Sequence, residues 1–268
     1  MIHLSDSRHP LQRHASRRQA LGYLAAGTLL ASLPSPGSRC DAGDSTPPVT
    51  RPGAVQTQAS RVYVFVDKTG LGHQHGVEAK LSASSLVLGA SQNAGKLVFD
   101  MKSFSADTAA ARKYVGLGGS TDASTRGAVN TNMRGPAVLD VARYPTATFE
   151  VTSATATGQT SSRGLPTYQL KGNFTLHGVT RPLAFSADVE QRSGWLHVRG
   201  RFSINQTSFG IQPYSKAFGA IGVTDRLTIF GDLYVAPTDQ VAMADIPSSK
   251  PSRSRLTIHT DTPDPGKQ

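Results

Sequence analysis

The stretch LKGNFTLHGVTRPLAF, residues 170–185, alternates apolar and polar side chains on both sides of a His-Gly pair. A period of two is typical of antiparallel strands that have one buried face and one solvated face. Gly178 can adopt the positive φ that a type I′ turn requires, so we expect His177 and Gly178 to close a two-residue hairpin loop. In that register Leu176 lies opposite Val179, and the apolar side chains of both strands fall on one face.

The same alternation recurs along the chain and predicts further strands. The segments concerned are 61–67, 96–101, 147–153, 195–205 and 227–235. So many strands with one dry face each indicate a closed barrel or a sandwich. We therefore predict an all-β fold, an antiparallel barrel that either packs solid or keeps a cavity for an apolar ligand.

Helical patterns occur only between the predicted strands. Residues 105–117 contain an Ala-rich run that ends at glycines, and residues 137–145 are stopped by Pro145. We expect one or two short helices there. Residues 118–136, between them, are expected to form a long polar connection, and a connection of that length is usually functional or mobile.

The two ends of the chain are expected to lie outside the barrel. Residues 1–40 have the design of an export signal, with Arg17-Arg18 followed by an apolar stretch of 13 residues. That stretch is shorter than the roughly 20 residues of a membrane span. SRRQAL resembles the twin-arginine motif, with Ala20 where Phe is common, and a short amphipathic helix of the mature protein is the alternative reading.

These features predict the domain organisation. We expect a signal over residues 1–40, a flexible linker over 41–60, the barrel over 61–236 and a disordered tail over 237–268. The expected location is periplasmic or secreted. The single cysteine, Cys40, permits no internal disulfide, and the preceding arginine argues against lipidation of this cysteine.

The chain is basic, with a formal net charge of +10. Residues 61–236 alone contain 18 Lys and Arg against 11 Asp and Glu, but no run is longer than a pair. Nucleic-acid binders usually gather such charges on one face among aromatic residues, so we do not expect a nucleic-acid partner. Peripheral contact with an anionic membrane, an anionic ligand headgroup and a merely basic soluble surface remain as explanations.

Several segments together resemble the YceI-like family. They are LDVARYPTATFEV (139–151), LKGNFTLHGVTRPLAF (170–185), FSINQTSFGI (202–211) and VTDRLTIFGDLYV (223–235). The resemblance implies a lipocalin-like antiparallel barrel in an exported protein, and some members of the family hold a long-chain isoprenoid or related lipid. It brings no catalytic residues to this chain, and it is looser over residues 61–133.

Motifs for enzymatic chemistry are missing from the sequence. It contains no G-x-S-x-G elbow, phosphate-binding loop or dinucleotide fingerprint, and GLGGS at 116–120 is better explained as a helix stop. We therefore expect no cofactor and a binding protein instead of an enzyme.

Two histidines are the candidate polar residues of the site. If HQHGVEAKL (73–81) is a strand, His73 and His75 share its apolar face and point into the barrel. They could then hydrogen-bond to the backbone, bind a ligand headgroup or supply half of a metal site, for which His177 at a turn and His197 on the wet face are badly placed.

The leading hypothesis is an exported barrel that binds an apolar, isoprenoid-like ligand. Its predicted ligand-binding residues are His73, His75, Phe149, Phe174, Phe185 and Phe202. A metal-dependent enzyme using His73 and His75 is one alternative, and a structural or interaction module of the cell envelope is another.

Overall fold

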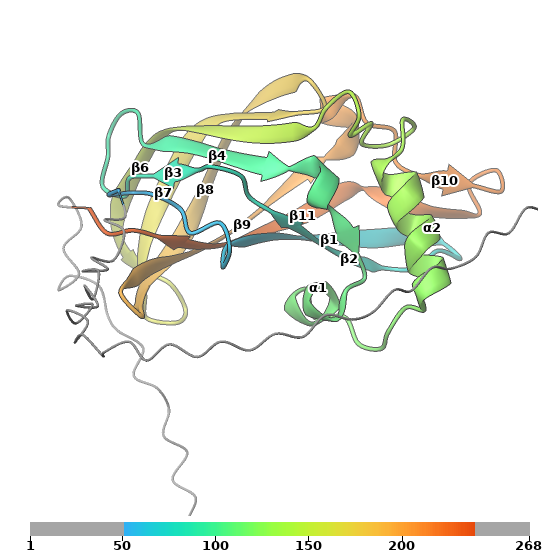
Figure 1. Ribbon diagram of the computed structural model, residues 1–268, viewed down its shortest axis with the longest axis horizontal. Coiled ribbons are helices and arrows are strands. Elements are labelled where there is room, and N and C mark those ends of the chain that lie inside the picture. The colour runs from blue at the N-terminus through green and yellow to red at the C-terminus, as the bar shows by residue number, and fades with distance from the viewer. Residues whose placement is uncertain (1–50, 239–268) are drawn as a thin grey trace, which may run out of the picture. The chain divides into compact units, whose positions relative to one another are not determined.

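A computed structural model of the chain describes residues 51–238 (Figure 1). Its strands form one antiparallel sheet in the order β3-β4-β6-β7-β8-β9-β11-β1-β2-β5, with β10 paired to β11. The strands are β1 (Arg61–Gly70), β2 (His75–Lys80), β3 (Ser85–Leu86), β4 (Gly95–Asp100), β5 (Ser105–Ala106), β6 (Thr146–Thr160), β7 (Pro166–Leu176), β8 (Val179–Arg192), β9 (Trp195–Asn205), β10 (Ser215–Lys216) and β11 (Ile221–Val235). The helices are α1 (Ala109–Tyr114) and α2 (Ala123–Arg134), with 3-10 turns η1 (Met101–Ser103) and η2 (Gln206–Phe209).

The sheet curls until strands near its two edges meet. An antiparallel bridge joins Leu81, just after β2, to Phe99 of β4. The Ser82 N–H also donates to the Val98 carbonyl at 2.8 Å. These contacts turn the sheet into the antiparallel, lipocalin-like barrel that the alternation predicted, and the fold class is confirmed.

The β7–β8 hairpin has the predicted register. Leu176 pairs with Val179 at its end. His177 and Gly178 have φ of 52° and 75°, as a type I′ turn requires. The alternation extends into the barrel wall, because Phe149, Leu170 and Phe174 are all buried.

The described chain has two short helices in the connections, as predicted, but their positions differ in part. Helix α1 begins only at Ala109, because residues 105 and 106 pair with β2 as strand β5. Residues 137–145 form turns and no helix, whereas α2 lies within the expected polar connection, residues 118–136. No residue of α2 is fully buried, so its sequence has no wide apolar stripe to reveal it.

The packed domain begins earlier than expected. Val55, within the predicted linker, is buried and forms an antiparallel bridge with Val235. Ala54 forms another bridge with Ser85. Residues 54–60 thus belong to the barrel, while the predicted export signal, Cys40 and nearly all of the predicted tail lie outside the described residues.

Helix α1 packs against the outer surface of the sheet. Tyr114 stacks on Tyr63 of β1 with the ring centroids 3.9 Å apart. Burial raises the pKa of both phenols. The helix backbone lies so close to β2 that a Cβ on Gly76 would be 2.9 Å from the Ala111 carbonyl carbon. Within residues 51–238, neither α-helix has the length and apolar character needed to cross a membrane.

Candidate ligand pocket

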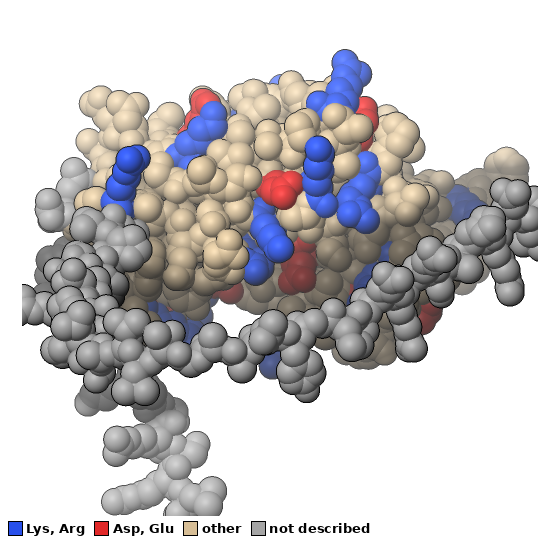
Figure 2. Space-filling model, in the orientation of Figure 1, with Lys and Arg blue, Asp and Glu red and all other residues tan. Residues whose placement is uncertain are grey.

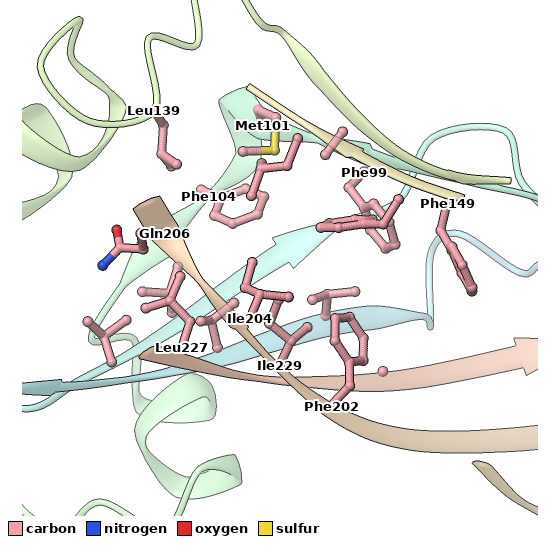
Figure 3. Close-up of a pocket in the computed structure, with 18 of the residues that line it drawn as sticks. Phe99, Met101, Phe104, Leu139, Phe149, Phe202, Ile204, Gln206, Leu227 and Ile229 are labelled. Carbon is pink, nitrogen blue, oxygen red and sulfur yellow. The ribbon is translucent and has the colours of Figure 1, made fainter. Parts of the chain in front are cut away.

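A cavity of about 200 Å³ lies inside the barrel. Figure 3 shows apolar side chains from opposite walls directed into it. Among the lining residues that the structure describes there is no Asp, Glu, Lys or Arg, and the only polar side chains are those of His75, Asn132, Gln206 and Tyr214. A space of this kind offers water few hydrogen-bond partners, so an apolar ligand can displace that water at little cost.

Four phenylalanines line one continuous part of the pocket. The rings of Phe185 and Phe202 stack with centroids 4.8 Å apart, and Phe149 lies 5.7 Å from Phe185. Phe174 meets Phe202 edge to face at 6.2 Å. All four were predicted from the alternation to face inward, and all four line the cavity.

Two glycines in the wall leave space for other groups. A Cβ on Gly200 would lie 2.5 Å from the Phe185 ring, so this glycine makes room for that ring. A Cβ on Gly231 would meet no heavy atom within 4 Å, although Gly231 lines the pocket. Part of the cavity therefore exists because β11 carries no side chain at this position.

Helix α2 covers one end of the cavity. Val129 and Met133 contribute apolar lining there, and Asn132 donates to the Tyr214 hydroxyl at 3.4 Å. The helix is tied to the barrel by the Ala106 N–H, which donates to the Asn130 side chain at 2.8 Å. Figure 1 shows α2 at the end of the molecule that also carries the β10–β11 hairpin. We call this end the pocket mouth.

His75 lies at the mouth and is oriented by a buried carboxylate. Its Nδ1 lies 2.7 Å from Asp107 Oδ2, while Asp107 Oδ1 accepts from Arg112 at 3.1 Å and from the Gly76 N–H at 3.2 Å. Burial opposes ionisation of Asp107, but these partners outweigh it and hold the pKa of the carboxyl below its ordinary value. Asp107 is then a carboxylate at neutral pH, so Nδ1 carries the donated proton and Nε2 remains for another partner.

His73 does not share this position. It is exposed in the segment between β1 and β2, because the β1–β2 pairing ends at Val66 and His75. The expected pair of inward histidines is therefore wrong for His73. A metal site built on both imidazoles loses its geometric basis, and residues 51–238 hold no group of three or more His, Cys, Asp and Glu placed to bind a metal.

His197 also differs from expectation, since it is buried although it faces outward. Its Nδ1 lies 3.1 Å from Glu190 Oε1, its Nε2 contacts Asp232, and its ring stacks on Tyr234 with centroids 4.4 Å apart. Arg199 adds an ion pair to Glu190 at 2.9 Å. This polar cluster ties β8, β9 and β11 together on the outside of the barrel and takes no part in the pocket.

Several pocket residues escaped sequence reasoning. Asn132 lies on a helix that was not predicted, and Gln206 and Tyr214 follow the end of β9, where alternation stops. Asp107, which orients His75 from behind the lining, was also missed, because it lies in the connection before α1 with a φ of 54°. The one sequence signal for these residues was Asp122, which marks the start of α2: its side chain caps the helix by accepting from the Thr125 N–H at 2.9 Å.

Comparison with known families decides the relationship of the chain. The YceI-like domain matches residues 54–233, more than half of the sequence. The chain belongs to the YceI-like family. This match spans every strand from β1 to β10 and most of β11.

Two sequence relatives match part of the chain. A UPF0312 protein of Azotobacter vinelandii is 34% identical over 119 residues, which are 41% of this chain and 59% of that protein. A UPF0312 protein of Pseudomonas savastanoi pv. phaseolicola is 36% identical over 80 residues, 28% of this chain and 38% of that protein. The chain thus spans less than two thirds of the length of these relatives.

Two solved structures resemble the chain more distantly. Burkholderia cenocepacia BcnA has a TM-score of 0.44 at 17% identity, covering 67% of this chain and 98% of its own. A polyisoprenoid binding domain from Saccharophagus degradans has a TM-score of 0.43 at 14% identity, covering 69% and 98%.

Proposed function

We propose that the protein binds an apolar, isoprenoid-like lipid inside its barrel. The observation that carries this proposal is the cavity itself, which is enclosed by Val, Leu, Ile, Met and Phe side chains and has no Asp, Glu, Lys or Arg in its lining within residues 51–238. A branched hydrocarbon chain would contact these groups closely and lose no hydrogen bonds on leaving water.

The distribution of polar groups suggests which way the ligand lies. Asn132 and Tyr214 lie beside each other at the mouth, and His75 is held there by Asp107. The aromatic wall of Phe149, Phe185 and Phe202 would receive the apolar chain. In this arrangement a polar headgroup stays at the mouth, where His75 Nε2 can accept a hydrogen bond from a hydroxyl group.

Export to the periplasm or the medium is part of the same proposal. Its support is the sequence alone, namely the arginine pair and apolar stretch within residues 1–40. Cell fractionation of the native host, with an antibody against the barrel, tests this location. Recovery of the protein only from the cytoplasm would contradict it.

Native mass spectrometry of the full chain purified from its own host tests the binding. We expect a lipid-sized mass increase that organic extraction removes. The Gly231→Leu variant should lower lipid occupancy about tenfold, because a leucine in the open space beside Gly231 overpacks the bound state.

A matched control keeps this test specific. Thr228→Leu places the same side chain on the same strand but on the opposite face, since the neighbours Leu227 and Ile229 line the pocket and Thr228 does not. It should retain the lipid. Equal occupancy in both variants, or no bound lipid in the wild-type protein, would contradict the proposal.

A further inference from the structure

The exposed large apolar residues of the described chain are gathered in one place. They are Leu71, Phe218 and Ile221. Leu71 follows β1, and the other two belong to the β10–β11 hairpin, about 150 residues later in the sequence. Single exposed apolar side chains are ordinary, but a cluster formed by distant segments indicates a contact surface.

Backbone pairing brings these residues together. Gly70 pairs with Ile221, which also pairs with Lys216, and the Leu71 N–H donates to the Ala220 carbonyl at 2.9 Å. We call residues 67–73 and 215–222 the apolar tip. Figure 1 shows that β10 and its hairpin project beyond α2 at the mouth end of the barrel.

The hairpin turn presents Phe218 to solvent. Ala217, Phe218 and Gly219 have φ of 51°, 54° and 91°, and the Ala220 N–H donates to the Ala217 carbonyl at 3.1 Å. A bulky residue rarely adopts a left-handed conformation. The turn thus holds an aromatic ring outward at a backbone position that disfavours it, a combination that burial against a partner would explain.

Charge identifies the kind of partner. Lys68 and Lys216 lie in the tip, and its only acidic residue, Asp67, accepts a hydrogen bond from the Gln74 side chain at 2.9 Å. Lys68 pairs with Val223 and Lys216 with Ile221, so both lysines lie on the strand face that continues into the pocket. Apolar side chains flanked by lysines match an anionic lipid surface, where they enter the acyl boundary beside negative headgroups.

The rest of the surface agrees with such a partner. Figure 2 shows Lys and Arg spread over the visible face with fewer Asp and Glu between them. A general positive potential speeds the approach to an anionic bilayer, while the tip supplies the orientation.

The tip is continuous with the pocket mouth. Val223, two residues after Ile221 on the same face of β11, lines the cavity, as does Tyr214, the residue before β10. We propose that the apolar tip inserts into the surface of an anionic lipid bilayer and thereby places the pocket mouth against the membrane. This rests on the proposed lipid binding and deepens it, because the ligand could then pass between bilayer and pocket without crossing water. The docking itself can be measured without any ligand.

A tryptophan at the tip provides a direct test. The chain has one tryptophan, Trp195, next to the β8–β9 turn. It lies at the opposite end of the barrel, because the following residue, Leu196, pairs with Val235 at the far end of β11. In a Trp195→Phe background, the Phe218→Trp variant carries its only tryptophan in the tip.

We expect the emission of this variant to shift to the blue on adding vesicles of phosphatidylglycerol and phosphatidylcholine in equal parts. Brominated lipid should quench it. Wild-type protein, which reports from Trp195, should show neither change in the same vesicles. Because the emission comes from the tip itself, membrane contact through residues 1–50 cannot imitate the result.

Flotation with the same vesicles measures the energetic contribution of the tip. The Leu71→Ser/Phe218→Ser variant should partition at least about tenfold less than wild type, since burial of two apolar side chains is lost. Lys216→Ala should weaken binding severalfold and reduce its salt dependence, whereas Lys171→Ala, an equal charge change in β7, should act less.

Three results would overturn the proposal. One is unchanged emission of the Phe218→Trp variant with vesicles to which the protein has bound. Another is absence of wild-type binding to anionic vesicles. The third is a concentration-dependent dimer that the Leu71→Ser/Phe218→Ser variant abolishes without any change in flotation, which would assign the tip to a second copy of the chain. A barrel that proves to hold no lipid would leave the emission result intact, so the two proposals fail separately.

Discussion

Asp107 shows how a single residue can set the chemistry of the pocket mouth. Its φ of 54° is tolerated by Asp and Asn better than by most residues. In this conformation the carboxylate reaches His75, Arg112 and the Gly76 N–H together. One side chain thus joins β2 to α1 and fixes the tautomer of the imidazole beside the cavity.

We expect Asp107→Asn to lower the free energy of unfolding by about 1–3 kcal/mol at pH 7, because it weakens buried charge-assisted hydrogen bonds while keeping the backbone preference. The folded-state pKa of Asp107 lies below its ordinary value of 3.8, so the unfolded chain binds more protons in acid. The stabilisation is therefore complete above about pH 4 and is lost as the pH falls through the folded-state pKa. Urea unfolding at several pH values should show the wild type and the variant converging in acid.

Asp140→Asn is the control for this prediction. Asp140 also has a left-handed backbone, with φ of 41°. Asp140 is only half-buried, so the same substitution there should change stability by less than about 0.5 kcal/mol. A constant difference between wild type and Asp107→Asn from pH 7 into acid would contradict the assigned role.

The orientation of a side chain could be predicted from the sequence where its residue lies well inside a long strand. Phe149, Phe174, Phe185 and Phe202 lie within long strands, and alternation placed all four correctly. His73 was misplaced because alternation cannot locate the start of a strand, and β2 begins two residues later.

At the scale of elements, the contact between α1 and β2 depends on Gly76. A Cβ there would lie 2.9–3.0 Å from backbone atoms of Ala111 and Arg112, which cannot rotate away as a side chain would. Gly76→Ala should therefore displace α1 and lower the free energy of unfolding by about 1–3 kcal/mol. Urea unfolding measures the loss, and hydrogen exchange should rise in residues 109–114.

Gly231→Ala is the matched control for this substitution. Its added methyl meets no heavy atom within 4 Å, and alanine lowers the entropy of the unfolded chain. Stability should stay equal or rise by up to about 1 kcal/mol. If Gly76→Ala proved as harmless as Gly231→Ala, the close packing of α1 would not limit stability.

Helix α2 explains why elements were less predictable than strands. Its sequence, ASTRGAVNTNMR, mixes Thr, Asn and Gly with few strong helix formers, and none of its residues is fully buried. Its place is set by tertiary contacts, such as the hydrogen bond from the Ala106 N–H to Asn130. Such contacts leave no local period in the sequence.

For the molecule as a whole, the period of two predicted the architecture but not the cavity. The alternation of apolar and polar residues in each strand shows which of its faces is buried, so an antiparallel barrel can be predicted from local patterns. Whether that barrel is hollow depends on side-chain volumes summed across facing strands, including the space that Gly231 leaves open. The alternation within single strands does not show the total side-chain volume across facing strands.

A hollow barrel with an apolar lining should gain stability from its ligand. Binding to the folded state alone contributes about 2.7 kcal/mol when the free ligand is at 100 times its Kd. For a domain of this size that corresponds to a rise in Tm of roughly 5–11 °C. We therefore expect protein stripped of lipid by organic extraction and refolding to melt lower than the native preparation, and to recover when the extracted lipid is returned. Scanning calorimetry measures both steps.

The Gly231→Leu variant, with its cavity partly filled, should melt at nearly the same temperature before and after extraction. An equal fall in both proteins would mean that the extraction damages the barrel, and no fall in either would mean that the cavity holds no stabilising ligand.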